Sequence, residues 1–214
     1  NNIPFESIMA ASKNYEMFKH IKQDALSETR RLAVERGACP DDDSCEVRNA
    51  HLLAIAPNAS SSIIMGNTSP SVEPWRANAY RQDTLSGAFL NKNKYLDGLI
   101  LSKIESGETK QDYDEIWSSI IANDGSCQHI RFMTAEEKEV FKTSMEIDQR
   151  WVVEHAADRQ NFIDQSQSLN LFFRPDVNIK YLHAVHFLAW KKGVKTLYYC
   201  RSEKLGKADK VSAR

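Results

Sequence analysis

Several features that would narrow the class of this protein are scarce in its 214 residues. Its 28 Lys and Arg residues almost balance 29 Asp and Glu residues, and the net charge of −1 provides no basic surface of the kind that nucleic-acid-binding proteins use. No apolar run approaches the roughly 20 residues that span a bilayer, and the first residues lack a signal-peptide pattern. These absences predict a cytoplasmic protein with no nucleic-acid or membrane partner.

Cysteine is also scarce, at 4 residues, too few and too scattered for a disulfide scaffold. Cys39 and Cys45 flank an acidic turn, but zinc sites usually add a second pair of ligands, and none is visible in the sequence. His183 and His186 share an expected helix, again without a third ligand. We therefore predict no metal site. The chain also lacks an initiator Met, so we expect that it was trimmed, cleaved or belongs to something longer.

The hydrophobic periodicity predicts a helix-rich α/β fold without internal repeats. Apolar side chains at helical spacing indicate one long helix or two over residues 5–36, and Gly37 follows at the C-cap position. Further helices are expected over 91–104, 111–122, 134–157 and 176–192, the third of them beginning with a capping box. Strands are expected over 51–56 and 194–200. An ordered loop is expected over 66–74 and a tight turn at 123–126. The tryptophans are expected to be packing residues: Trp75, Trp117, Trp151 and Trp190.

So few short strands do not make a stable sheet by themselves. Because the strands are apolar enough to be internal, their missing neighbours are expected on another polypeptide. We therefore expect that this sequence supplies only part of a fold. The isolated chain should expose apolar surface that drives association or aggregation.

The most informative stretch is 51–66, where an apolar strand leads into a hydroxyl-rich turn and then a helix. Such a turn presents unpaired backbone N–H groups and hydroxyls at the positive end of the helix dipole, which suits an anion such as phosphate. The same pattern is also that of a plain helix N-cap, which Ser and Asn commonly form. The turn by itself leaves both interpretations open.

Five collinear motifs resemble the C-terminal portion of the large catalytic subunit of class I ribonucleotide reductase. They are 48–62 together with Ser71-Val72-Glu73-Pro74, then Leu85-Ser86-Gly87-Ala88-Phe89, 123–126, 162–170 and 190–199. The resemblance implies that residues 1–214 form the second side of an α/β barrel with surrounding helices, incomplete without the N-terminal part. It divides the chain into a phosphate-binding turn at 57–61, a helix and Tyr-Tyr strand at 176–200, and a tail at 201–214. The implied reaction is the reduction of ribonucleoside diphosphates to deoxyribonucleoside diphosphates by radical chemistry for DNA synthesis.

The resemblance assigns the substrate diphosphate to a turn made of Pro57, Asn58, Ala59, Ser60 and Ser61. Tyr198 and Tyr199 match a stacked pair that passes a radical from the small subunit to the active-site cysteine. Adjacent residues of a regular strand point to opposite faces, so stacking requires a local departure from strand geometry. A phenol suits this transfer because it can release a proton and an electron together, and its pKa of about 10 keeps it protonated until then.

The resemblance also implies parts that do not match this chain. In the family a thiyl cysteine, a neighbouring carboxylate and amide, and a redox cysteine pair precede every matched motif, and a further cysteine pair ends the subunit. The chain is therefore expected to be active only with the polypeptide that carries these cysteines, as a natural split or as a fragment. The other expected partners are a small subunit with a metal-radical cofactor, and thioredoxin or glutaredoxin as the reductant. The chain itself is expected to bind no cofactor. The alternative is a non-catalytic phosphate-binding or assembly module derived from the reductase, which would not need both tyrosines.

Overall fold

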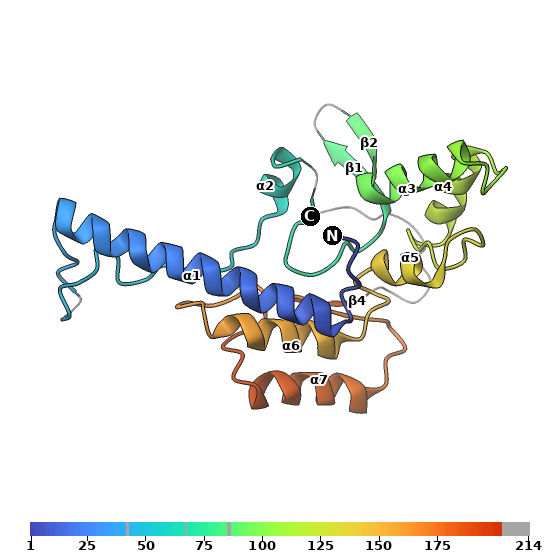
Figure 1. Ribbon diagram of the computed structural model, residues 1–214. Helices are drawn as coiled ribbons and strands as arrows, with labels where there is room; N and C mark the ends of the chain where they lie inside the picture. The colour runs from blue at the N-terminus through green and yellow to red at the C-terminus, as the bar shows by residue number, and fades with distance from the viewer. Residues whose placement is uncertain (42, 67, 85–86, 203–214) are drawn as a thin grey trace.

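The computed structural model describes residues 1–214 except 42, 67, 85–86 and 203–214. Within the described residues the chain forms seven helices and four short strands around two hydrophobic clusters. None of these strands closes into a barrel (Figure 1). The fold is therefore the helix-rich, incomplete α/β arrangement that the sequence predicts.

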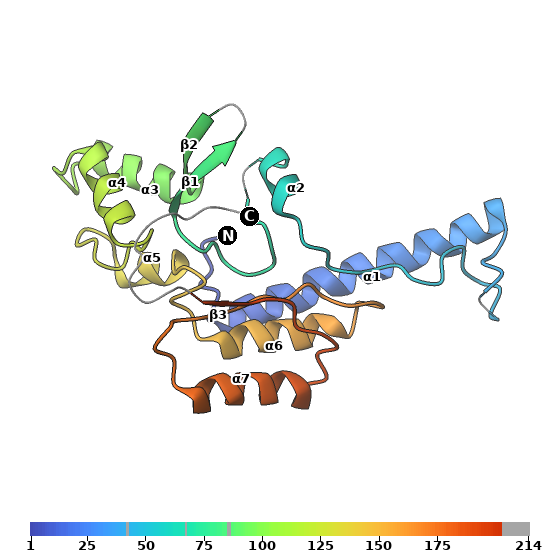
Figure 2. The ribbon, with the colours of Figure 1, turned by 180° about the vertical axis from the view of Figure 1, so that it is seen from behind.

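The longest element is α1 (Ile8–Arg36), a single helix of 29 residues. The Ser7 side chain caps its first turn by accepting the Ala10 N–H at 3.1 Å. Gly37 follows with φ of +85°, a conformation that side chains with a Cβ rarely adopt, and the helix ends there. Helix α1 packs along α6 (Gln149–Gln160), and Figure 2 shows its C-terminal half extending beyond α6. Neither α1 nor another described helix is long and apolar enough to cross a membrane.

A helical lobe is built around the first hydrophobic cluster. It comprises the antiparallel hairpin β1 (Ala79–Thr84) and β2 (Gly87–Lys92), with α3 (Lys94–Glu105), α4 (Tyr113–Ala122) and α5 (Ala135–Val140). Its buried side chains are Ala79, Leu96, Ile100, Ile116, Trp117, Ile120, Cys127, Ile130, Met133 and Phe141. These positions recur every three or four residues along α3 and α4, which is the spacing of one helix face.

The tight turn at 123–126 lies against the backbone before β1. The Asn78 N–H donates to the Gly125 carbonyl at 3.0 Å, and Asn78 Nδ2 donates to the Gly125 and Phe141 carbonyls at 3.1 and 2.9 Å. Gly125 has φ of +77°, and a Cβ there would lie 2.4 Å from Ala77 Cβ. Both the backbone conformation and the close approach therefore require glycine.

Three segments run parallel to one another and form what we call the parallel layer. They are the stretch 53–55, the stretch 165–173 that ends in β3 (Leu171–Phe173), and the stretch 198–202 that ends in β4 (Cys200–Ser202). Strands β3 and β4 pair directly, and Gln167 forms a parallel bridge with Ile55. No further strand pairs with either edge of this layer within the described part of the chain. The layer is open on both sides, as expected for part of a barrel.

The second hydrophobic cluster joins the parallel layer to α6 and α7 (Ile179–Lys191), which lie beneath it in Figure 1. Its buried side chains are Ile147, Val152, Val153, Ala156, Leu169, Leu171, Phe173, Val185 and Ala189. About 1.5–3 kcal/mol is gained for each large side chain of this kind that is fully buried. This burial holds the layer in place without help from strands that are missing here.

The structure corrects several predicted boundaries. The helix expected over 134–157 is two helices, α5 and α6, because residues 141–148 form turns that bond elsewhere, such as the Ser144 N–H to the Trp75 carbonyl at 2.8 Å. The capping box that starts α5 is confirmed at Thr134. The strand expected over 51–56 is reduced to the bridge at Ile55, because only this residue meets the regular pairing geometry.

Other differences lie near the C-terminus. The helix expected over 176–192 is α7, and the strand expected over 194–200 begins only at Cys200, so the tyrosine pair precedes β4. The tail expected over 201–214 contributes Arg201 and Ser202 to β4, and the rest of it lies outside the described residues, as do Leu85 and Ser86. The expectation that every tryptophan packs is wrong for Trp190, which is 73% exposed on the outer face of α7.

Candidate functional site

The hydroxyl-rich turn follows Ile55 and opens α2 (Ala59–Ile64), the helix that the sequence predicts. The Asn58 N–H donates to the Pro70 carbonyl at 3.3 Å, and the Ser61 hydroxyl lies 3.3 Å from the Asn58 carbonyl oxygen. Pro57, Asn58 and Ser61 are exposed. The first turn of a helix leaves its N–H groups without intrahelical acceptors. One expected donor, the Asn58 N–H, is thus engaged with Pro70, and the Ser61 hydroxyl donates within the turn.

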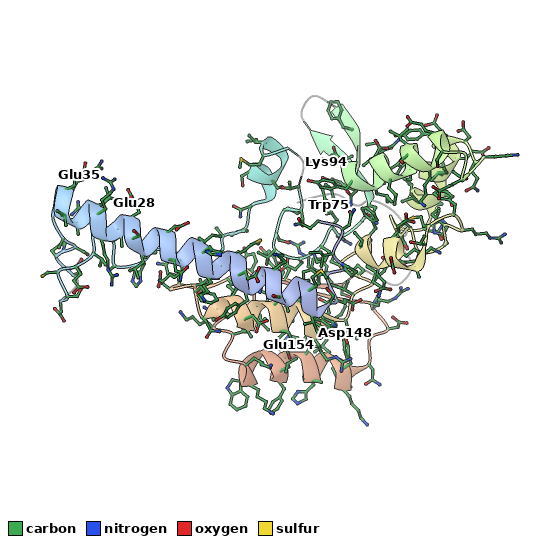
Figure 3. All side chains as sticks on the ribbon, viewed as in Figure 1. Glu28, Glu35, Trp75, Lys94, Asp148 and Glu154 are labelled. Atoms are coloured by element: carbon green, nitrogen blue, oxygen red, sulfur yellow. The ribbon has the colours of Figure 1, made fainter. Side chains whose placement is uncertain are left out.

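A lysine of the helical lobe holds the far end of α2. Lys94 Nζ, labelled in Figure 3, donates to the Gly66 carbonyl at 2.8 Å. Gly66 has φ of +95° and lies at the end of the helix. The short helix after the turn is therefore fixed at both ends, by Pro70 and by Lys94.

Two tyrosines face a single residue of the neighbouring segment. The Tyr198 N–H donates to the Leu169 carbonyl at 2.7 Å, and the Leu171 N–H donates to the Tyr199 carbonyl at 2.9 Å. In regular parallel pairing a single residue supplies both the N–H and the carbonyl that bond to the two neighbours of the residue opposite it. Here the residue opposite is Asn170, and the N–H and the carbonyl come from two different tyrosines. Two residues facing one constitute a β-bulge, which interrupts the alternation of side chains.

The bulge brings the two phenol rings together. The ring centroids of Tyr198 and Tyr199 are 4.0 Å apart with an interplanar angle of 48°, and the Tyr198 hydroxyl donates to the Tyr199 hydroxyl at 3.2 Å. This hydrogen bond raises the pKa of Tyr198 above its usual value of 10.0. The Arg201 guanidinium lies 4.9 Å from the Tyr199 ring centroid. The departure from strand geometry that stacking requires is present.

The turn and the tyrosine pair lie at the same end of the parallel layer. Ile55 is level with Gln167 in the bridge, and Asn170, which faces the tyrosines, is three residues beyond Gln167. Asn58 is likewise three residues beyond Ile55. The turn therefore follows the carboxyl end of one parallel segment, where open α/β sheets bind their ligands, and the tyrosine pair lies level with it, just before β4.

An open cavity of about 630 Å³ adjoins Tyr198 and the segment that leads into the turn. It is lined by Ala54, Ile55, Gln165, Ser166, Gln167, Ser168, Thr196, Leu197 and Tyr198. These residues come from all three segments of the parallel layer, and their side chains are apolar or neutral polar groups. The volume is in the range of small-molecule sites. A second cavity of about 370 Å³ lies in the helical lobe around His129 and contains no predicted site residue.

The motif at 162–170 supplies structural hydrogen bonds. The Asp164 carboxylate accepts the Leu52 and Leu53 N–H groups at 2.8 and 3.1 Å and forms an ion pair with Lys22 of α1. Burial alone would raise the pKa of Asp164, but the Lys22 ammonium and the two N–H groups outweigh burial and lower it. Asp164 thus fixes the segment that leads to the turn.

Gln167 connects the same motif to the helices behind the layer. Its Oε1 accepts from Arg159 Nε at 2.6 Å, and its Nε2 donates to the Ala156 carbonyl at 2.9 Å. Arg159 is only 3% exposed, and burial lowers its pKa to about 10, so the guanidinium stays protonated at neutral pH. Buried polar groups satisfied in this way favour one register of the layer over others.

Apart from the exposed Cys200, which follows Tyr199 directly, the candidate ligands and nucleophiles described next lie away from this site. No group of three or more His, Cys, Asp or Glu side chains that could hold a metal ion occurs in the part of the chain that is described. His183 stacks on Phe187 with centroids 6.1 Å apart. His186 Nδ1 lies 2.8 Å from the Leu182 carbonyl oxygen. Cys127 is buried in the helical lobe, and burial raises the pKa of its thiol to about 12, so it is an unreactive core residue.

Sequence reasoning gave no role to Glu73, although it belongs to a matched motif. Glu73 is 2% exposed, and its carboxylate accepts the Asn170 N–H at 2.6 Å. A carboxylate is rarely buried unless it is paired or hydrogen-bonded. An acidic residue between Val72 and Pro74 was the one local signal that could have indicated this burial.

Comparison with known proteins identifies the family. The model described as "Ribonucleotide reductase, barrel domain" matches residues 43–200. The chain is 50% identical over 214 residues to the "Ribonucleoside-diphosphate reductase large subunit" of Invertebrate iridescent virus 6, covering 99% of this chain and 22% of that protein. It is 35% identical over 233 residues to the protein of the same name from Danio rerio, covering 94% of this chain and 28% of that protein.

A solved structure gives the same result. The "Actinobacillus ureae class Id ribonucleotide reductase alpha subunit" matches with a TM-score of 0.83 and 40% identity, covering 95% of this chain and 36% of that one. The chain spans 22%, 33% and 34% of the length of three viral relatives that it matches. Because the family model covers more than half of the sequence, the chain belongs to the ribonucleotide reductase family and forms part of its barrel domain.

Proposed function

We propose that this chain is the C-terminal part of the large subunit of a ribonucleoside-diphosphate reductase. The assembled enzyme reduces ribonucleoside diphosphates to deoxyribonucleoside diphosphates by radical chemistry, for DNA synthesis. The observation that carries the proposal is the pair Tyr198 and Tyr199, with hydroxyl oxygens 3.2 Å apart, in a chain of this family. Relatives that share a third to a half of their residues with this chain carry the name of that enzyme.

In this proposal the turn at 57–61 binds the substrate diphosphate. Its support is the exposure of Pro57, Asn58 and Ser61, the place of the turn at the carboxyl end of a parallel segment, and the cavity of about 630 Å³ beside Ile55. N–H groups of the first turn of α2 and the Ser61 hydroxyl would donate to phosphate oxygens. The Asn58 N–H is held by Pro70, so Asn58 would contribute through its side chain.

The tyrosine pair relays the radical. The raised pKa of Tyr198 keeps its phenol protonated at neutral pH, so its oxidation must release a proton together with an electron. The contact between the hydroxyls supports transfer of a hydrogen atom between the rings, in which one O–H bond breaks as the other forms. The net result is that the radical moves by one residue while a proton and an electron move the other way.

The remaining chemistry requires other polypeptides. We propose that the chain acts in the cytoplasm with the large-subunit polypeptide that carries the catalytic cysteines and with a small subunit whose metal-radical cofactor starts the relay. Thioredoxin or glutaredoxin would restore the cysteines. Support comes from the open edges of the parallel layer and from exposed apolar side chains on α1, such as Ile8 at 82% and Val34 at 92%. Surfaces of this kind indicate an interaction partner.

Two experiments test the proposal. Native mass spectrometry of the complex purified through a tag on this chain should show a polypeptide with the missing cysteines and a small subunit. In that complex, Tyr199→Phe should abolish turnover because phenylalanine has no O–H to exchange, whereas Tyr95→Phe, 64% exposed on α3, should not. Ser61→Ala should raise KM for the diphosphate. Turnover that survives Tyr199→Phe would favour the alternative, a non-catalytic phosphate-binding or assembly module.

A further inference from the structure

We propose that Glu73 is a positioning residue that fixes the tyrosine pair and the substrate turn relative to each other. The inference rests on the proposed function, because it deepens the account of the same site. Glu73 touches neither phenol and lies outside the turn at 57–61. It acts through two neighbours, the backbone of Asn170 and the loop at 68–73.

The carboxylate of Glu73 is buried and fully engaged. Its Oε1 accepts the Asn170 N–H at 2.6 Å, and its Oε2 accepts Asn170 Nδ2 at 3.3 Å and the Ser71 hydroxyl. With 2% of its surface exposed, solvent cannot replace these donors. Leaving a buried N–H group without its acceptor is unfavourable, because no water replaces the lost hydrogen bond. The interaction therefore constrains where the Asn170 backbone lies.

Asn170 is the residue that faces the bulge. Its neighbours Leu169 and Leu171 make the backbone hydrogen bonds to Tyr198 and Tyr199, at 2.7 and 2.9 Å. Because Leu169 and Leu171 direct their backbone groups at the tyrosine segment, the Asn170 N–H between them points to the other side of the strand and needs another acceptor. Glu73 supplies that acceptor, so it holds the segment against which the tyrosines are placed.

The same residue holds the loop that supports the turn. The Ser69 hydroxyl donates to the Glu73 carbonyl at 2.7 Å. One residue further, the Pro70 carbonyl accepts the Asn58 N–H at 3.3 Å, inside the substrate turn. A path of hydrogen bonds and chain therefore runs from Asn58 through the loop and the Glu73 carboxylate to Asn170, on the segment that faces the tyrosines.

The reach of Glu73 is what its contact with Asn170 requires, and its charge acts on a different group, the buried Arg159 guanidinium, whose protonated form it favours. Gln has the same length and keeps an oxygen that can accept the Asn170 N–H. Its amide N–H can donate to the Ser71 hydroxyl, because a hydroxyl can accept a hydrogen bond as well as donate one. Asn170 Oδ1 is buried without a hydrogen-bond partner, so rotation of the Asn170 amide can offer it to the new donor. Asp keeps the charge but retracts the oxygens by about 1.5 Å, one C–C bond, which breaks the 2.6 Å contact.

The test compares Glu73→Asp and Glu73→Gln in the assembled reductase, with Glu146→Asp as matched control. Glu146, which is half-buried, likewise accepts a backbone N–H, from Thr143 at 2.8 Å, but it lies beside the helical lobe. We expect Glu73→Asp to raise KM and lower kcat, each about tenfold, and Glu73→Gln to stay within about threefold on both. Glu146→Asp should leave KM unchanged. A purely structural loss would reduce the amount of active enzyme and leave KM unchanged.

A spectroscopic readout separates positioning from stability. With 3-fluorotyrosine at position 198, the ¹⁹F chemical shift should move in Glu73→Asp and not in Glu73→Gln or Glu146→Asp. If Glu73→Gln folds but loses activity, the charge matters and the inference is overturned, whether or not Glu73→Asp folds. If Glu73→Asp changes neither KM nor the ¹⁹F shift, the inference also fails. Either result leaves the proposed function standing as long as Tyr199→Phe is inactive, whereas an active Tyr199→Phe removes the proposed function itself.

Discussion

Gly125 and Gly107 provide a matched pair for measuring how closely the turn at 123–126 approaches the backbone before β1. Both glycines have φ of +77°. A Cβ at Gly107 would meet nothing within 4 Å, whereas a Cβ at Gly125 would lie 2.4 Å from Ala77 Cβ and 2.8 Å from Ala77 Cα. These atoms cannot rotate away, because they are backbone or directly attached to it. The two Gly→Ala substitutions therefore share the backbone strain and differ only in the steric clash.

The expected losses follow from these two terms. Gly107→Ala should lower the free energy of unfolding by about 1–2 kcal/mol, the cost of a left-handed conformation with a Cβ. Gly125→Ala should lose this amount plus about 1–3 kcal/mol for overpacking. Urea denaturation followed by tryptophan fluorescence measures both, and Trp117, 2% exposed, reports on the same lobe. Equal losses in the two variants would refute the close approach of Ala77 to this turn.

Two further predictions concern pH. Desolvation by burial lowers the pKa of His155 from its usual 6.5, so as the pH falls the unfolded chain binds this proton before the folded chain does. At pH values under 6.5 the free energy of unfolding should therefore decrease, by up to about 1.4 kcal/mol per pH unit. His155→Gln should make the free energy of unfolding less dependent on pH in this range, whereas His20→Gln, on the exposed face of α1, should leave the dependence unchanged. Equal pH dependence in the two variants would contradict the assignment of this effect to His155. The lowered pKa of Asp164 stabilises the fold above pH 3.8, and this contribution is lost as pH falls through the lowered value. Asp164→Asn should therefore cost about 1–3 kcal/mol at pH 7 and little at pH 2, and a pH-independent loss would show that its charge is not what matters.

The predictions that succeeded concern features set by residues close together in the chain. The capping box at Thr134, the helices on either side of Gly107, and the helix that opens after Asn58 all depend on contacts within a few residues. Such contacts are present in any conformation that forms the helix, so composition and spacing reveal them. The motif order likewise indicated the family, which the comparison with known proteins confirmed.

The predictions that failed concern features set by other segments. Residues 141–148 continue an apparently helical pattern, but bonds such as Ser144 N–H to the Trp75 carbonyl hold them in turns. The hairpin β1–β2 and the strand β3 were not predicted, because their short sequences carry no clear alternation. Trp190 was expected to pack, yet it is exposed, since no described segment covers the outer face of α7.

The sequence by itself determined the helices, the hydroxyl-rich turn and the presence of two adjacent tyrosines. The tertiary structure decided what those residues can do together. Tyr198 and Tyr199 have close rings because the pairing with Leu169 and Leu171 inserts an extra residue, and Glu73 meets Asn170 across almost a hundred residues of chain. Neither contact leaves a periodic signal in the sequence, because each depends on the register between segments that only folding brings side by side.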